Sequence, residues 1–84
     1  MTRDEIKEKI QNLFESKYGI KLSEFTEETL IAEFSELDQR LDSIEFMNFI
    51  FDVEDMFSVK NRALGIPKTV GDLFTIFEKA INQK

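Results

Sequence analysis

The chain of 84 residues contains no cysteine and no histidine, and these two absences exclude several kinds of chemistry. Without thiols the chain forms no disulfides and offers no thiol nucleophile, and the usual zinc sites lose their ligands. Without imidazole, serine–histidine catalysis and histidine-based acid–base catalysis are excluded as well. Carboxylates are plentiful, but no second type of catalytic residue converges on them in the sequence. We therefore do not expect an enzyme.

The sequence also lacks any apolar run long enough to span a bilayer, so we expect no membrane insertion. Residues 1–5 are charged and lead into an amphipathic segment, which is unlike a signal peptide. Acidic residues outnumber basic ones, 17 against 11, which gives a net charge of −6. This charge opposes binding to nucleic acid or anionic lipid and favours partners with basic patches. We expect a cytoplasmic protein and a monomer.

Apolar residues are abundant: they make up 42% of the chain and include nine phenylalanines, enough for a dense core. A chain of this length forms a single domain, here residues 1–84, which buries roughly 60% of the surface that the unfolded chain exposes. The apolar residues recur at helical spacing in three long segments. The expected fold is all-α, a small bundle of three main helices plus one short helix, with a long first loop.

The first helix is expected over about residues 3–17. Thr2 and Glu5 fit a capping box at its start, and Gly19 can take the left-handed conformation that ends a helix. Its apolar face consists of Ile6, Ile10, Leu13 and Phe14. The following residues, 20–41, are too apolar for a solvated linker. We expect them to pack across the bundle, with one or two helical turns over residues 27–34.

The second helix is expected over residues 43–57 and the last helix from Thr69, which pairs with Asp72 as a cap. Between them, Gly65 and Pro67 break the chain, and residues 62–64 can form one short helical turn. Residues 82–84 should fray. The core stripe of the second helix contains Phe46, Phe49, Ile50, Val53 and Phe57. The buried face of the last helix contains Leu73, Phe74, Ile76, Phe77, Ala80 and Ile81.

Three apolar residues of the second helix, Ile44, Met47 and Phe51, lie roughly 140° away from its core stripe. Five carboxylates and no lysine or arginine lie between residues 42 and 57. An apolar centre with an acidic rim suits brief recognition by basic partners. The same three residues can instead pack beneath residues 20–41, and the acids can form a merely solvated face. The sequence leaves these alternatives open.

The triplet Asp42-Ser43-Ile44 opens the second helix. Asp42 is a good N-cap, and Ser43 then lies in the first turn, where free backbone N–H groups and the helix dipole suit an anion such as a phosphodiester. The triplet resembles the Asp-Ser-Leu signature of the acyl carrier protein family. The apolar–acidic pattern of residues 46–57 resembles the second helix of that family, and residues 66–73 resemble its Thr-Val entry to the final helix.

The resemblance implies a carrier that performs no chemistry itself. A phosphopantetheinyl transferase, using coenzyme A and magnesium, would attach 4′-phosphopantetheine covalently to Ser43, and Asp42 would help it engage the serine. The arm would hold acyl intermediates as thioesters for fatty acid or specialised acyl and polyketide biosynthesis. Acyl-transferring and synthase enzymes with basic docking patches would be the other partners. The partner-binding residues would be Ile44, Glu45, Met47, Asn48, Phe51, Glu54 and Asp55.

The chain departs from the family pattern at several places. Asn48 stands where a glutamate is common, Arg40 replaces a small residue, and the loop that begins at Lys21 is longer than usual. These departures make a specialised carrier as compatible as the general fatty-acid carrier. The many aromatic core residues add a hypothesis about cargo: they fill the space between the helices and limit it to short acyl groups. The residues concerned are Phe46, Phe49, Phe57, Phe74 and Phe77.

Two other functions stay open from the sequence. An aminoacyl or peptidyl carrier domain uses a similar triplet, usually after paired glycines, where this chain has Arg40-Leu41. An unmodified acidic helical interaction module would use the second helix only for binding. A calcium loop over residues 38–45 is rejected, because Arg40 occupies a ligand position and the required glycine is missing.

Overall fold

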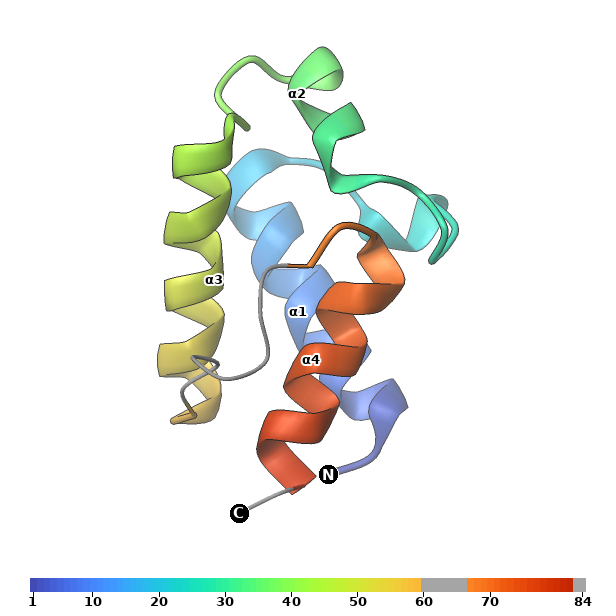
Figure 1. Cartoon of the computed structure of the whole chain (residues 1–84), viewed down its shortest axis with the longest axis vertical. Helices are drawn as coiled ribbons and strands as arrows, with labels where there is room; N and C mark the ends of the chain where they lie inside the picture. The colour runs from blue at the N-terminus through green and yellow to red at the C-terminus, as the bar shows by residue number, and fades with distance from the viewer. Residues whose placement is uncertain (60–66, 83–84) are drawn as a thin grey trace.

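The structure, a computed structural model, describes residues 1–59 and 67–82, with Ser43 described by its backbone alone. Three long helices form the bundle: α1 (Arg3–Tyr18), α3 (Ser43–Phe57) and α4 (Val70–Asn82). Three short helical turns lie between α1 and α3: η1 (Leu22–Glu24), η2 (Ile31–Glu33) and α2 (Phe34–Leu37). Figure 1 shows α1 and α4 packed together with α3 beside them, while the segment between α1 and α3 crosses one end. The expected all-α bundle is confirmed.

The ends of α1 follow the capping residues of the sequence. The Thr2 hydroxyl accepts a bond from the Glu5 N–H, and the Glu5 carboxylate accepts one from the Thr2 N–H, each at 3.2 Å. At the other end Gly19 has φ of 71°, and its N–H donates to the Glu15 carbonyl at 2.8 Å. The helix ends one residue later than predicted, at Tyr18.

The other two long helices also begin after a residue whose side chain caps them. Asp42 Oδ1 accepts a bond from the Glu45 N–H at 2.8 Å, so α3 begins at Ser43 as predicted. Thr69 Oγ1 accepts a bond from the Asp72 N–H at 3.0 Å, and the Asp72 carboxylate accepts one from the Thr69 N–H at 3.2 Å. Asn82, which was expected to fray, still belongs to α4. Residues 83 and 84, and the turn predicted at 62–64, lie outside the described residues.

Aromatic rings from all parts of the bundle meet in the core. The centroid of the Phe14 ring lies 5.1 Å from that of the Phe49 ring, in a T-shaped arrangement, and 5.5 Å from that of the Phe34 ring. Phe74 and Phe77 are fully buried beside them. The predicted core stripes of α3 and α4 are confirmed, except that a few members at their edges are only half-buried: Phe57, Ala80 and Ile81.

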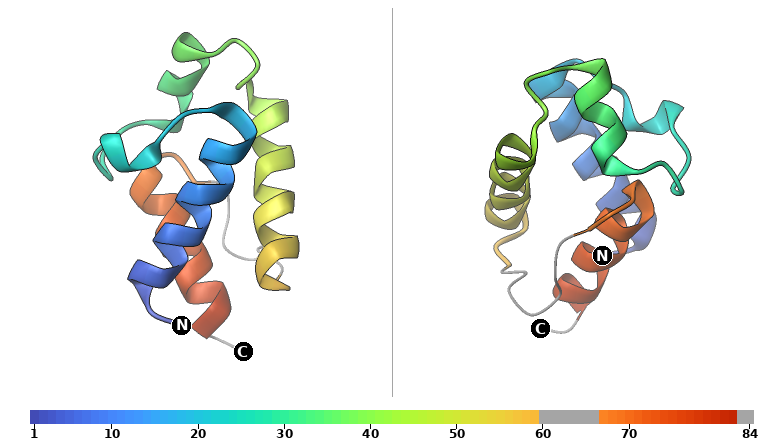
Figure 2. Two further views of the ribbon diagram at one scale, coloured as in Figure 1. Left: turned by 180° about the vertical axis from the view of Figure 1, so that it is seen from behind. Right: turned by 45° about the horizontal axis from the view of Figure 1, so that its top comes forward.

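The segment over residues 20–41 packs across one end of the bundle, as expected (Figure 2). The helical turns predicted at 27–34 are wrong for the first part of that range, because helical turns occur at 22–24 and 31–37 instead. The reason is a competing set of backbone bonds with the entry to α4. The Ile31 N–H donates to the Lys68 carbonyl at 2.9 Å, and the Val70 N–H donates to the Thr29 carbonyl at 3.0 Å.

We call residues 27–31 together with their bonds to residues 68–71 the clasp. Its backbone bonds include a third, from the Gly71 N–H to the Glu27 carbonyl at 2.8 Å. The Glu27 carboxylate also binds Arg3 at 2.6 Å and Lys7 at 3.3 Å on α1. Arg3 in turn binds Glu78 on α4 at 3.2 Å. The clasp therefore joins the first loop to both helices of the α1–α4 pair.

Among the described residues, no helix has both the length and the apolar character needed to cross a membrane.

Candidate attachment site and partner surface

Ser43 is the first residue of α3, directly after the capping residue Asp42. The backbone N–H groups of a first helical turn lack intrahelical partners and carry the positive end of the helix dipole. One of them is already used here, since the Glu45 N–H donates to the Asp42 carboxylate at 2.8 Å. The Phe46 N–H forms the first regular helical bond, to the Asp42 carbonyl at 3.0 Å. Asp42 therefore fixes the start of α3, and with it the position of Ser43 in the first turn.

Arg40, which departs from the family pattern, forms an ion pair within its own loop. Its guanidinium binds the Asp38 carboxylate at 2.7 Å. Hydrogen bonds from Arg40 hold the pKa of Asp38 below its usual range. The added positive charge is thus matched by a neighbouring carboxylate, and the start of α3 keeps its acidic surroundings.

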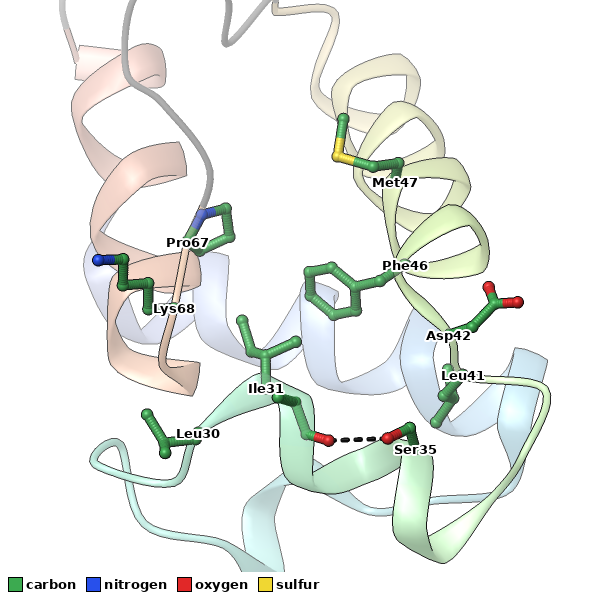
Figure 3. A pocket seen from close by; sticks show the side chains of 10 residues that line it. Leu30, Ile31, Ser35, Leu41, Asp42, Phe46, Met47, Pro67 and Lys68 are labelled. Carbon is green, nitrogen blue, oxygen red and sulfur yellow. Dashed lines mark hydrogen bonds between the residues drawn. The ribbon is translucent and has the colours of Figure 1, made fainter.

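A cavity of about 650 Å³ lies beside the start of α3 (Figure 3). Phe46 and Met47 face it from α3, and Ile31 and Pro67 face it from the other side. The Lys68 side chain extends away from it. The wall is mostly apolar, and Asp42 lies at its edge, so the cavity adjoins the residue next to Ser43. The described residues that line it are Leu30, Ile31, Ala32, Ser35, Leu41, Asp42, Phe46, Met47, Pro67 and Lys68.

This cavity changes the hypothesis about cargo. Phe49, Phe74 and Phe77 fill the core as predicted, and Phe57 packs against Phe77 with ring centroids 6.1 Å apart. Of the five aromatic residues, only Phe46 lines the cavity. The buried rings agree with a filled core between the helices, whereas the cavity beside α2 and the start of α3 is room that the hypothesis did not include. The limit to short acyl groups stays a hypothesis.

The sequence left open whether Ile44, Met47 and Phe51 form a partner surface or pack beneath residues 20–41. The structure gives a different answer for Met47 than for the other two. Ile44 is 74% exposed and Phe51 is 52% exposed, so neither is covered by residues 20–41. Met47 is half-buried, packs against the core and lines the cavity. Asn48 and Asp55 are exposed on the same helix. The exposed part of the predicted partner surface therefore holds two large apolar side chains rather than three.

Two of the carboxylates on α3 are held by the last turn of α1. The Tyr18 hydroxyl donates to Glu45 at 3.0 Å, and Lys17 forms an ion pair with Asp52. Burial and the bond to Glu45 raise the pKa of Tyr18 to about 12, so the hydroxyl stays protonated and keeps donating at neutral pH. Within the described residues, Glu54 and Asp55 form no ion pair.

Neither these two partners from α1 nor most of the cavity could be predicted from the sequence. Tyr18 lies 27 residues from Glu45, and Lys17 lies 35 residues from Asp52. No local pattern connects residues at such separations. A cavity wall drawn from α3, the first loop and the entry to α4 has no local signal either.

The chain is 30% identical over 82 residues to a protein of Thermotoga maritima named acyl carrier protein, and the alignment covers 95% of this chain and 96% of that protein. This chain therefore belongs to the acyl carrier protein family. No family model matches the chain. No solved structure matches it either.

Proposed function

We propose that this chain carries acyl groups as thioesters on a 4′-phosphopantetheine arm attached to the Ser43 hydroxyl. The observation that carries the proposal is the family relationship along nearly the whole chain, together with a serine that opens α3 directly after its capping aspartate. The carrier catalyses no reaction itself. It serves fatty acid biosynthesis or a specialised acyl or polyketide pathway in the cytoplasm.

The residues around Ser43 fit such an arm. The first turn of a helix suits the phosphodiester through its backbone N–H groups and dipole. The adjoining cavity offers an apolar wall to an acyl chain, and each methylene that leaves water there contributes about 0.8 kcal/mol. When bound, the arm supplies the thiol that this chain lacks, since the sequence contains no cysteine. Asp42 holds Ser43 in the position where the transferase meets it.

The partners are a phosphopantetheinyl transferase and acyl-transferring or synthase enzymes with basic docking patches. Their contacts lie on α3, at residues that share an acidic and partly apolar surface. Tethering keeps the acyl group at high effective concentration while each enzyme binds briefly. The proposed contact residues are Ile44, Glu45, Met47, Asn48, Phe51, Glu54 and Asp55.

The test is the intact mass of the protein before and after incubation with coenzyme A, magnesium and a broad-specificity phosphopantetheinyl transferase. The wild type should gain one phosphopantetheine, and Ser43→Ala should gain none. Ser16→Ala, a matched change at an exposed position of α1, should be modified like the wild type. Circular dichroism checks that all three proteins are folded.

A wild type that gains no mass, while a control carrier is modified in the same reaction, would refute the proposal. The acidic interaction module would then be the leading function. A modified chain that accepts amino acids from an adenylating enzyme would instead be an aminoacyl carrier.

A further inference from the structure

The exposed surface of α3 divides into one outward strip and two flanks. At 100° per residue, Ile44, Asn48, Phe51 and Asp55 form the outward strip. All four are exposed. Glu45 and Asp52 lie on the flank toward α1. Met47 and Glu54 lie on the opposite flank, and these four flank residues are half-buried.

The flank toward α1 is already occupied by groups from the same chain. Lys17 pairs with Asp52, and Tyr18 donates to Glu45. An ammonium group and a hydroxyl donor are the kinds of group with which a basic partner would bind these carboxylates. The last turn of α1 therefore forms contacts with these two carboxylates that a basic partner would otherwise form.

The remaining charge lies near one end of the strip. Glu54 and Asp55 form no ion pair in the described part of the chain, and both belong to the last turn of α3. The C-terminal end of a helix dipole is negative, which adds to the attraction for a cation there. Asn48, in the middle of the strip, carries no charge.

The apolar part of the strip has a defined spacing. Ile44 and Phe51 are seven residues apart on the same face, which places them about 10 Å apart along the helix axis. They are the two most exposed large apolar residues of α3, at 74% and 52%. Large apolar side chains at the centre of an interface contribute most of its binding energy, whereas charges at its edge mainly steer the encounter.

We propose that the last turn of α1 competes internally for the docking surface of α3. On the partner surface proposed above, this leaves Ile44 and Phe51, about 10 Å apart along the helix, and the carboxylates of Glu54 and Asp55 for the phosphopantetheinyl transferase. This inference rests on the proposed carrier function, because the partner is one of the enzymes that act on the arm.

Removing the internal competitor should strengthen binding. Lys17→Gln frees Asp52, and Tyr18→Phe frees Glu45 while keeping the ring that packs 4.9 Å from Phe14. Both changes remove a tie between α1 and α3, so each should lower stability slightly. A merely structural role for Lys17 and Tyr18 would not raise affinity, and this opposite direction separates the two explanations.

The experiment measures the dissociation constant for the phosphopantetheinyl transferase at several salt concentrations, with Ser43→Ala as the background so that no arm is transferred. Lys9→Gln is the matched control, because it removes the same charge from an exposed position of α1. Lys17→Gln should bind about two- to fivefold more tightly than Lys9→Gln at low salt, with a steeper loss of affinity as salt rises. Tyr18→Phe should bind about twofold more tightly than the background.

Two further pairs of variants test which residues a partner meets. Glu54→Gln should weaken binding more than Glu45→Gln, since Glu45 is already held by Tyr18. Ile44→Ala and Phe51→Ala should each weaken binding by about tenfold or more. Met47→Ala should weaken it less, because Met47 is half-buried.

Equal affinities of Lys17→Gln and Lys9→Gln, or equal losses for Glu45→Gln and Glu54→Gln, would overturn the inference. Absence of binding by every variant would overturn it too. Failure of the carrier function has a different signature, namely a wild type that binds the transferase and gains no mass.

Discussion

The α1–α4 side and the α3 side of the bundle are stabilised by different kinds of contact. On the α1–α4 side, the clasp joins the first loop to both helices through three backbone hydrogen bonds and the carboxylate of Glu27. On the other side, α3 contributes a buried core stripe, and among the side chains that the structure describes it has two polar contacts with α1, at Glu45 and Asp52. Its outward strip meets solvent.

One part of the chain therefore maintains the fold, and another part presents a surface. The α1–α4 pair and the clasp form a scaffold whose polar groups largely bind one another. The surface of α3 leaves Ile44 and Phe51 exposed, and its carboxylates at Glu54 and Asp55 form no ion pair among the described residues. Substitutions on the first side should therefore lower stability, and those on the second should mainly lower binding.

The largest difference in the free energy of unfolding is expected between alanine substitutions of two phenylalanines in the same helix. Phe49 is fully buried and Phe51 is 52% exposed. Phe49→Ala should lower the free energy of unfolding by about 3–5 kcal/mol, because it leaves a large void in the core. Phe51→Ala should change that free energy by less than about 0.5 kcal/mol. Denaturation in urea, followed by circular dichroism, measures both. Similar losses would show that the two sides of α3 do not differ as described.

A smaller loss of folding stability is expected from Gly71→Ala in the clasp. A Cβ at this position would lie 2.9 Å from the Glu27 Cβ and 3.0 Å from the Glu27 carbonyl oxygen, the acceptor of the Gly71 N–H. The clasp must shift to admit the methyl group, at a cost of about 1–3 kcal/mol. The free energy of unfolding in urea measures this cost.

A double-mutant cycle with Glu27→Gly serves as the control for Gly71→Ala. It should show that the two changes together cost less than their sum, because the closest atom in the clash is then absent. Strict additivity would mean that the loss arises within α4 and not in the clasp.

The smallest effect concerns the charge of Glu27. The hydrogen bond from Arg3 holds the pKa of Glu27 below its ordinary value of 4.5 in the folded state. Its contribution to stability is therefore fully present above pH 4.5 and is lost as pH falls through the lowered pKa. Because the side chain is 45% exposed, Glu27→Gln should cost only about 0.5 kcal/mol at neutral pH.

Urea midpoints measured across this acidic range test the effect of Glu27. The wild type and Glu27→Gln should converge at the acid end, below the lowered pKa of the carboxyl group. A difference that stays constant down to that end would assign the loss to packing and not to charge.

Most of the fold could be predicted from local sequence signals. The boundaries of α1 and α3 lie within one residue of those predicted, because Thr2, Asp42 and Gly19 cap helices through bonds to residues three or four positions away. Residues 20–41 were placed less well. Their backbone groups bind residues 68–71, and a contact across about half the chain leaves no local pattern.

The candidate site could likewise be predicted only where its signals are local in the sequence. The helical period correctly separated Ile44 and Phe51 from the core stripe, but it could not tell that Met47 turns toward a cavity. The sequence also could not show which carboxylates of α3 have partners within the chain, since Tyr18 and Lys17 reach Glu45 and Asp52 only after α1 and α3 have packed. The roles proposed for Ser43 and Asp42 remain predictions from the sequence and the family.

The contacts of Arg3 also bear on when this protein can fold during its synthesis. Arg3 binds Thr75 at 3.1 Å and Glu78 at 3.2 Å, across 72 and 75 residues. The ribosome makes α1 before its packing partner α4, and at about 5–20 residues per second several seconds separate them. During that interval the apolar face of α1 has no α4 to cover it. We expect folding to wait until α4 has left the ribosome, so any enzyme that recognises folded α3 meets a chain that already includes α4.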